Sequence, residues 1–454
     1  MPHQITWSMY NRIATLSVAV LMVLGLGACD ILEVENPNTL SESELDNPTA
    51  ARPMLNGLQA SVTNALGSMY SPYSTVTDEV TWVGSRDAWL NLSRGFVGDP
   101  LNEFSDNRFL DIAEAEWMSR EFVSRLEGFQ EEGTLPDEAI LAEAYLHGAT
   151  AKTTVADMFD DWAFSNKTEA GEPIGEQNMT QLYDQALDFV NKGLDLGAGL
   201  EAELSAVRAR ILFSRSVWSK VHPTGQVNTD DPLVSNQEAA QAAQAALDAM
   251  DQDDFLYDLP VSQDGDFSSD IAFQINQRDE LLPDTTVYVE PLDPKNAAEV
   301  GEVVFQDPVD EVTHPFLERI ILNRYQGNLN EFSDITVASA REMHLIIAEV
   351  ALANGDTGPG SEFRAHMNEL RSLDDLSSYD GPDEEGVSRL ELLKNSRQAN
   401  LFMQGRRLTD MYRFGEISPG GGEDRGWQPS SDAVQNPGTF FPLTNTEIRA
   451  NPNL

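Results

Sequence analysis

The sequence holds a single cysteine, Cys29, in 454 residues. No intramolecular disulfide can form, so burial of apolar side chains must stabilise the fold. Hydrophobic residues make up 41% of the sequence, which is enough for a sizeable core in a chain of this length. We therefore expect a folded protein with one large domain or two to three ordinary ones, and not a disordered tail.

Cys29 lies where an apolar segment ends. Residues 1–28 contain Arg12 as their only Arg or Lys and no acidic residue, and the apolar run 13–26 is followed by two small residues. This order is typical of a secretory signal. The run of about 14 residues is shorter than the roughly 20 that a membrane-spanning helix needs.

The tetrapeptide Leu26-Gly27-Ala28-Cys29 resembles the bacterial lipobox. The resemblance implies that residues 1–28 are a lipoprotein signal peptide and that Cys29 carries the lipid, through which alone the chain is held at the membrane. Several acyl chains anchor firmly, because each buried CH2 contributes about 0.8 kcal/mol. A plain signal peptide with an incidental cysteine is the alternative. Residues 29–47, rich in Asp, Glu, Asn and Pro, are expected to form an acidic tether.

The charge of the chain is strongly negative throughout. Asp and Glu number 75 against 29 Lys and Arg, which gives a net charge of -46. Such a field repels phosphate backbones, so we expect no nucleic-acid partner. The spread of acidic residues fits the hydrated, self-repelling surface of proteins from salt-rich habitats, with an ordinary acidic secreted protein as the alternative.

Helical periodicity covers most of the chain. Apolar and small residues recur at helical spacing from Leu141 to Ala149 and from Leu182 to Val190. Further helices are predicted at Phe109–Phe129, Glu201–Lys220, Gln237–Met250, 341–354 and 387–414. Small residues in AEAYLHGAT and LIIAEVALANGD indicate tetratricopeptide-like helical hairpins.

The segment 257–330 differs from its surroundings. It is rich in Asp and Pro, and alternates like a strand only near 285–290 and 302–305. Long irregular segments in compact domains are usually functional. We predict a single domain, 48–454, in which this segment separates an N-terminal helical part, 48–256, from a C-terminal one, 331–454.

The C-terminal end resembles a known family. RQANLFMQGRRLTDMYRFGE (397–416) and the closing FPLTNTEIRANPNL resemble the signature of the SusD/RagB family of nutrient-binding outer-membrane lipoproteins. The matching residues are Arg397, Gly405, Arg407, Asp410, Arg413, Phe414 and Gly415, then Pro442, Glu447, Ile448, Asn451, Pro452 and Asn453. The helix REMHLIIAEVALANGD (341–356) is also similar to one of the family. Asn400 and Gln404 stand where the family usually has glutamates, so an ion-pair network there is not carried over.

The resemblance implies a mostly α fold: a SusD-like fold with about four tetratricopeptide-like hairpins packed against an irregular ligand-binding part with few short strands. It also implies a lipid-anchored outer-membrane protein that faces the extracellular side. Such a protein binds an oligosaccharide, or sometimes a peptide, and delivers it to a TonB-dependent, SusC-like channel. No catalysis and no cofactor are implied.

Candidate ligand residues gather in the segment 70–96. Sugar recognition needs flat aromatic faces together with charged and amide groups for the hydroxyls. The candidates are Tyr73, Asp78, Trp82, Arg86, Asp87, Trp89 and Asn91. The alternative for the two tryptophans is a core position. The resemblance places a second wall in 257–330, with Phe273, Gln274, Asn276, Arg278 and Tyr288 as candidates. Arg407 and Asp410, three apart on a helix, are expected to form a structural pair.

Patterns for metal or nucleotide chemistry are absent from the sequence. The six histidines have no HxxxH or HExxH spacing, and acidic runs such as Asp251–Asp254 lack the glycine of a calcium loop. Walker, dinucleotide and nucleophile-elbow patterns are also missing. Two alternative functions stay open: a lipid-anchored glycoside hydrolase that uses a pair of carboxylates, and a helical-repeat scaffold without a small ligand.

Overall fold

The computed structural model describes residues 42–166, 168–263, 268–293, 296–420 and 425–454. Contacts divide the chain at Ala50 into two units, which are described separately. The described part of the first unit holds α2 (Glu42–Leu45) and the 3-10 turn η1 (Pro48–Ala50). The predicted signal peptide, the lipidation residue Cys29 and the tether up to residue 41 lie outside the described residues.

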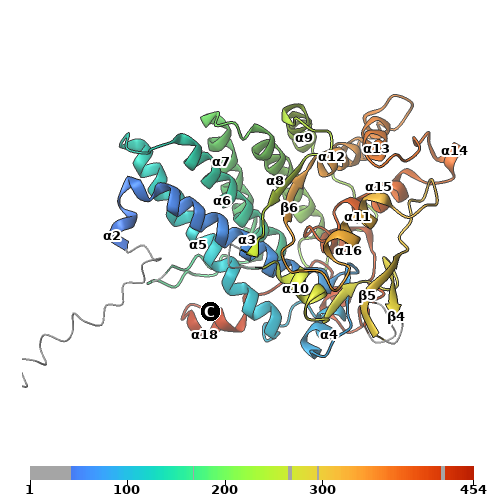
Figure 1. The fold of residues 1–454 in the computed structure, drawn as a ribbon, viewed down its shortest axis with the longest axis horizontal. Coiled ribbons are helices and arrows are strands. Elements are labelled where there is room, and N and C mark those ends of the chain that lie inside the picture. Colours follow the sequence, from blue (N-terminus) through green and yellow to red (C-terminus); the bar gives the residue numbers. More distant parts are fainter. Residues whose placement is uncertain (1–41, 167, 264–267, 294–295, 421–424) are drawn as a thin grey trace, which may run out of the picture. The chain divides into compact units, whose positions relative to one another are not determined.

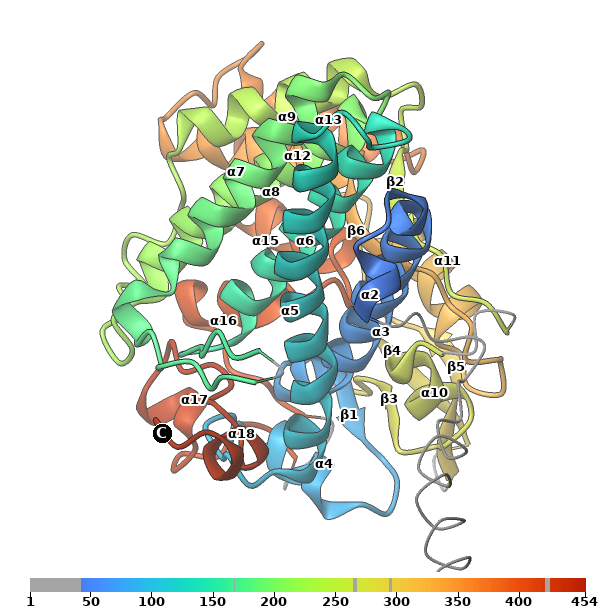
Figure 2. The same ribbon diagram turned by 90° about the vertical axis from the view of Figure 1, so that its left-hand side faces the viewer.

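The second unit, 51–454, is built on eight helices that pack on one another in chain order (Figures 1 and 2). Consecutive helices pair into four hairpins, which confirms the predicted mostly α fold. These helices are α3 (Ala51–Val76), α5 (Glu103–Glu131), α6 (Glu138–Met158), α7 (Thr180–Leu196), α8 (Glu201–Val221), α9 (Gln237–Ala249), α12 (Ala340–Ala353) and α13 (Glu362–Ser372).

Local sequence explains where these helices begin and how closely they pack. Side chains that accept hydrogen bonds from the first-turn N–H groups cap five of them: Asn102 at α5, Asp137 at α6, Asn236 at α9, Ser339 at α12 and Ser361 at α13. Gly148 of α6 faces the ring of Phe189 on α7, and a Cβ there would lie 2.9 Å from that ring. The small residue therefore allows the close approach of the two helices within one hairpin.

Between α9 and α12 the chain leaves the helical array (Figure 1). This insertion carries β2 (Leu256–Leu259), α10 (Asp270–Asn276), β3 (Leu281–Pro283), β4 (Val289–Asp293), β5 (Asn296–Val303), α11 (Pro315–Arg324) and β6 (Ile335–Ser339). The segment 257–330 is thus more regular than its sequence predicts. Register shifts interrupt the β4–β5 and β2–β6 pairs, and β3 pairs with the distant β1 (Val80–Trp82), so little strand alternation is visible locally.

The helix predicted over 387–414 is two helices, α15 (Arg389–Asn400) and α16 (Arg407–Phe414). A contact with a residue outside these two helices fixes the break between them. The N–H of Met403, which a continuous helix would donate to the carbonyl of residue 399, donates instead to Glu79 Oε1 at 2.6 Å. Met403 itself has a φ of 54°. The remaining helical elements are α4 (Asp87–Ser93), η2 (Glu176–Asn178), α14 (Pro382–Glu385), α17 (Asp432–Gln435) and α18 (Asn445–Ala450).

Candidate functional site

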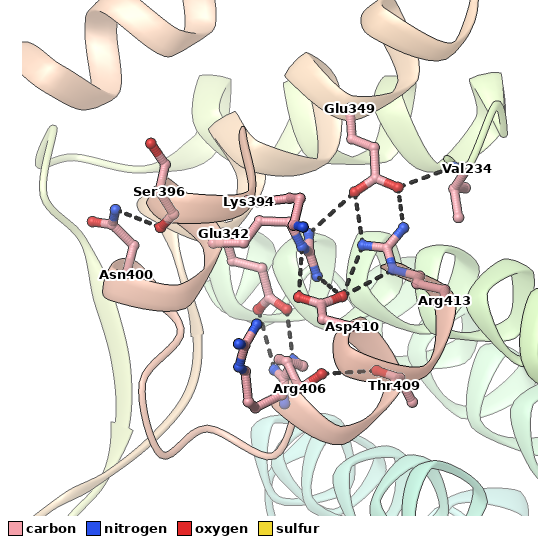
Figure 3. A network of polar contacts seen from close by, with 12 residues as sticks. Val234, Glu342, Glu349, Lys394, Ser396, Asn400, Arg406, Thr409, Asp410 and Arg413 are labelled. Atoms are coloured by element: carbon pink, nitrogen blue, oxygen red, sulfur yellow. Dashed lines mark hydrogen bonds and ion pairs between the residues drawn. The ribbon is translucent and has the colours of Figure 1, made fainter. Parts of the chain in front are cut away.

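Three charged side chains of the C-terminal signature, Arg397, Asp410 and Arg413, form a network in the interior with Glu349 of α12, here called the buried network. Figure 3 shows Asp410, Arg413 and Glu349 close together. Arg397 Nε and Arg413 Nε donate to Asp410 at 2.8 and 2.9 Å, and Arg413 Nη2 donates to Glu349 Oε2 at 2.9 Å. Burial opposes ionisation of Asp410, but the two guanidinium groups lower its pKa to about 2. The network holds α12, α15 and α16 together.

The predicted pair between Arg407 and Asp410 is wrong. Both belong to the interior, but Arg407 forms a two-pronged contact with Asp78, at 2.7 and 2.6 Å. Asp410 is already engaged by the guanidinium groups of the buried network, so tertiary partners prevail over the local i,i+3 pair. Glu349 and Asp78 are acids from other segments, Asp410 lies in α16 itself, and Asn400 accepts a hydrogen bond from Arg341 at 2.8 Å. The departure at Asn400 therefore leaves an ion-pair network in place.

Three of the predicted ligand residues are buried. Tyr73, on α3, and Trp89, on α4, are both 0% exposed. The Trp89 ring stacks on Phe104 at 3.8 Å between centroids. Asp78 is 5% exposed and is engaged by Arg407. In this structure the contacts of all three are to the protein itself.

The other four predicted residues reach the surface. Trp82, at the end of β1, is half-buried, while Arg86, Asp87 and Asn91 are exposed. Asp87 and Asn91 are four residues apart on α4, so they share one face of this helix. Arg86 makes one ionic contact, of 3.8 Å with Glu103, and both side chains are about half exposed. Its guanidinium carbon lies 5.8 Å from the centroid of the Phe104 ring. These four residues keep polar groups and an indole ring accessible to a ligand.

A buried carboxylate fixes the turn that carries them. Glu280 accepts hydrogen bonds from the N–H and hydroxyl of Ser85, both at 2.9 Å, and from the N–H of Arg86 at 3.0 Å. It also accepts from Trp82 Nε1 at 3.3 Å. Burial raises the pKa of Glu280, but these hydrogen bonds outweigh it and the net shift is downward. A Cβ at Gly84 would lie 2.4 Å from the Glu280 carboxylate, so the turn requires glycine there.

Arg425 completes this surface. Its guanidinium carbon lies 5.7 Å from the centroid of the Trp82 ring. We call Trp82, Arg86, Asp87, Asn91 and Arg425 the β1–α4 rim. Sequence reasoning missed Glu280, because the signal that joins it to Trp82 is strand pairing: Trp82 lies opposite Leu281, the residue after Glu280. It also missed Arg425, which comes to Trp82 from a segment far along the chain.

Only some of the residues predicted for the second wall lie at the surface. Tyr288, Gln274 and Asn276 are buried, and the Asn276 amide donates to the carbonyls of Arg324 and Asn330. Arg278 is exposed and Phe273 is half-buried. Pairing of β1 with β3 does bring the insertion beside Trp82, as the two-wall arrangement requires.

Within the described ranges, no three His, Cys, Asp or Glu residues are placed to share a metal ion. No helix among those same residues has the length and apolar character needed to cross a bilayer.

Comparison with known proteins gives a structural match only. No sequence-family profile and no curated protein match the chain. A SusD superfamily protein from Bacteroides fragilis aligns with a TM-score of 0.60 at 15% identity, over 90% of this chain and 99% of that one. The chain has the SusD fold.

Two further solved structures align over most of this chain. A SusD-like carbohydrate binding protein from Bacteroides vulgatus aligns with a TM-score of 0.59 at 11% identity, over 90% of this chain and 97% of that chain. B. fragilis NanU aligns with a TM-score of 0.54 at 12% identity, over 92% and 97%. Identities this low establish the SusD fold alone, so the ligand residues must be argued from this chain's own geometry.

Proposed function

We propose that this chain binds an oligosaccharide at the β1–α4 rim and delivers it, without catalysis, to a TonB-dependent outer-membrane transporter. The observation that carries the proposal is the turn held by Glu280, which fixes Trp82 and Arg86 at the surface of a SusD fold. One solved structure with this fold is described as a carbohydrate binding protein.

The chemistry of the rim suits a sugar. A half-exposed indole offers a flat apolar surface for one side of a pyranose ring. Arg86, Asp87 and Asn91 supply donors and acceptors for hydroxyl groups. Because the Glu280 hydrogen bonds hold the turn before a ligand arrives, little conformational entropy is lost on binding. The rim stays open to solvent, which favours capture followed by release.

Lipid anchoring at Cys29 and exposure on the outer face of the outer membrane belong to the same proposal. They are supported by the lipobox-like sequence and the acidic tether. We expect Cys29→Ser to release the protein from the membrane fraction and external protease to digest the native protein on intact cells. Protection of the native protein from that protease would place it on the other face.

Binding to purified mature protein tests the ligand class. A panel of neutral glucan, mannan, xylan and galactan oligosaccharides, with peptides of similar size, is titrated by calorimetry, and the sugars are analysed afterwards for cleavage. We expect at least one oligosaccharide class to bind and to be recovered intact. Cleavage abolished by one Asp or Glu substitution would establish a glycoside hydrolase instead. Failure of the whole panel, with a channel protein still co-purifying, would favour the scaffold.

A further inference from the structure

A second surface with aromatic character lies at the C-terminal end of α8. A groove of about 480 Å³ is lined by Glu176, Gln177, Trp218, His222 and Pro223. None of these residues belongs to the β1–α4 rim. The groove lies where α8 ends, beside the short turn η2 that precedes α7.

The aromatic side of this groove is a stack of three rings. Trp218 and His222 are nearly parallel, with centroids 4.1 Å apart and an interplanar angle of 11°. Phe440 lies behind His222, at 5.6 Å and 18°. His222 Nδ1 donates to the Trp218 carbonyl at 3.0 Å, which fixes the imidazole in the stack. Trp218 is half-buried and lines the groove, so the stack presents a rigid indole to it.

Polar groups at the groove wall are not all satisfied. Trp218 Nε1, His222 Nε2 and Asp160 Oδ1 are buried and have no hydrogen-bond partner among the described residues. His222 Nε2 lies 4.0 Å from both Asp160 Oδ1 and Glu176 Oε1. These atoms are covered by the groove wall, so the polar groups that a ligand can reach are those of Glu176 and Gln177. Hydroxyl groups, which both donate and accept, suit this carboxylate and amide.

The residues at the opening of the groove narrow the class of ligand further. Glu176 is held by the N–H and hydroxyl of Thr224, at 2.9 and 2.8 Å, and keeps 40% of its side chain exposed. Gln177 is exposed beside it. A carboxylate at the opening disfavours anions. The parallel rings offer one flat face and not the box of several faces that encloses a quaternary ammonium group.

We infer that the groove at Trp218 is a second carbohydrate site, which takes one neutral pyranose ring with its apolar face on the indole. The inference rests on the proposed function for its ligand class but not for its location. Two sites on one chain would let a long glycan bind at two points, so its apparent affinity would exceed that of either site alone wherever its length can span both.

Saturation-transfer NMR with D-glucose, D-galactose, D-mannose and D-xylose tests the groove in the full mature chain. Trp82→Ala is the background, because it weakens the rim. In this background we expect at least one sugar to keep its signal. Adding Trp218→Ala should lower the remaining affinity at least about tenfold, while Trp218→Phe, which keeps a flat ring, should retain most of it. Ser219→Ala, on an exposed neighbour in α8, is the matched control and should change nothing.

The outcomes separate this inference from the proposed function. If Trp82→Ala alone abolishes binding of all four sugars, the groove is not a binding site and the β1–α4 rim is supported as one. If Trp218→Ala abolishes sugar binding and Trp82→Ala does not, the groove is supported as a binding site and the β1–α4 rim is overturned as one. Silence of the native protein toward all four sugars overturns the groove, while the β1–α4 rim is still decided by the oligosaccharide panel. If Trp218→Ala fails to fold, Gln177→Ala at the exposed edge should weaken binding roughly threefold, and an unchanged affinity would overturn the groove.

Discussion

Two of the regions in which charged side chains lie beside aromatic rings, the buried network and the β1–α4 rim, differ in what their polar groups contact. In the buried network, Arg413 is 0% exposed and its guanidinium group contacts Asp410 and Glu349. At the β1–α4 rim, Arg86 is about half exposed and has one long ionic contact. Composition alone does not separate these regions. The candidate binding surface is distinguished by polar groups that remain free to form hydrogen bonds with solvent or a ligand, and not by charge near aromatic rings alone.

The segment 70–96 contributes residues to the protein interior as well as to the β1–α4 rim. Asp78 is taken into the interior by Arg407, whereas Arg86 stays at the surface on a turn held by Glu280. A buried ion pair leaves an uncompensated charge when one partner is removed, but an exposed pair does not. The two regions should therefore respond differently to substitution, stability changing in one and affinity in the other.

The largest expected effect lies in the buried network. Arg413→Ala removes one of the two guanidinium groups that Asp410 and Glu349 share, the other being that of Arg397, and should lower the free energy of unfolding by about 3–5 kcal/mol. Arg215→Ala is the control. Its partner Asp184 lies 3.0 Å away, and both side chains are about half exposed, so less than about 1 kcal/mol is expected. Denaturant unfolding followed by circular dichroism measures both, and equal changes would remove the distinction between the regions.

A smaller effect on stability should come from Glu79, whose pH dependence should differ from that of the paired carboxylates around it. Burial raises the pKa of Glu79 to about 7, and its Oε1 atom accepts from the Met403 N–H. In the unfolded chain a glutamate titrates near 4.3. The stability that the protonated form contributes is therefore present below that value and is lost as pH rises through 7.

Glu79→Gln keeps an acceptor oxygen but cannot ionise. From pH 5 to pH 8, the unfolding free energy of the native protein should fall relative to that of this variant by about 2–3 kcal/mol. Denaturant titrations of both proteins at the two pH values provide the comparison. Parallel pH dependence would show that Glu79 is ionised in the fold at both values.

Local sequence predicts much of the helical array. The helices predicted at Glu201–Lys220 and Gln237–Met250 are observed at Glu201–Val221 and Gln237–Ala249. Their boundaries follow from amphipathic spacing and, for α9, from the Asn236 cap, which are properties of neighbouring residues. The break between α15 and α16 depends on Glu79, 324 residues before Met403, and no local pattern contains it.

The candidate site likewise has features that the local sequence predicts and features that depend on distant residues. The segment 70–96 contains the rim residues Trp82, Arg86, Asp87 and Asn91, all visible in the sequence as an aromatic and polar cluster. Their exposure depends on Glu280, and the burial of Asp78 depends on Arg407, 329 residues away. Which members of such a cluster face solvent is set by tertiary pairing, so the sequence indicates the segment but not the surface.

The most direct test of the account uses the two tryptophans of this segment. Trp82→Ala removes a half-exposed ring, while the Ser85 and Arg86 hydrogen bonds still hold the turn. Trp89→Phe keeps an aromatic ring against Phe104 inside the protein. The measurement is calorimetric affinity for the tightest-binding oligosaccharide of the panel. The account predicts a loss of at least about tenfold, or 1.4 kcal/mol, for Trp82→Ala and native affinity for a folded Trp89→Phe. Native affinity in Trp82→Ala together with a tenfold loss in Trp89→Phe would contradict it.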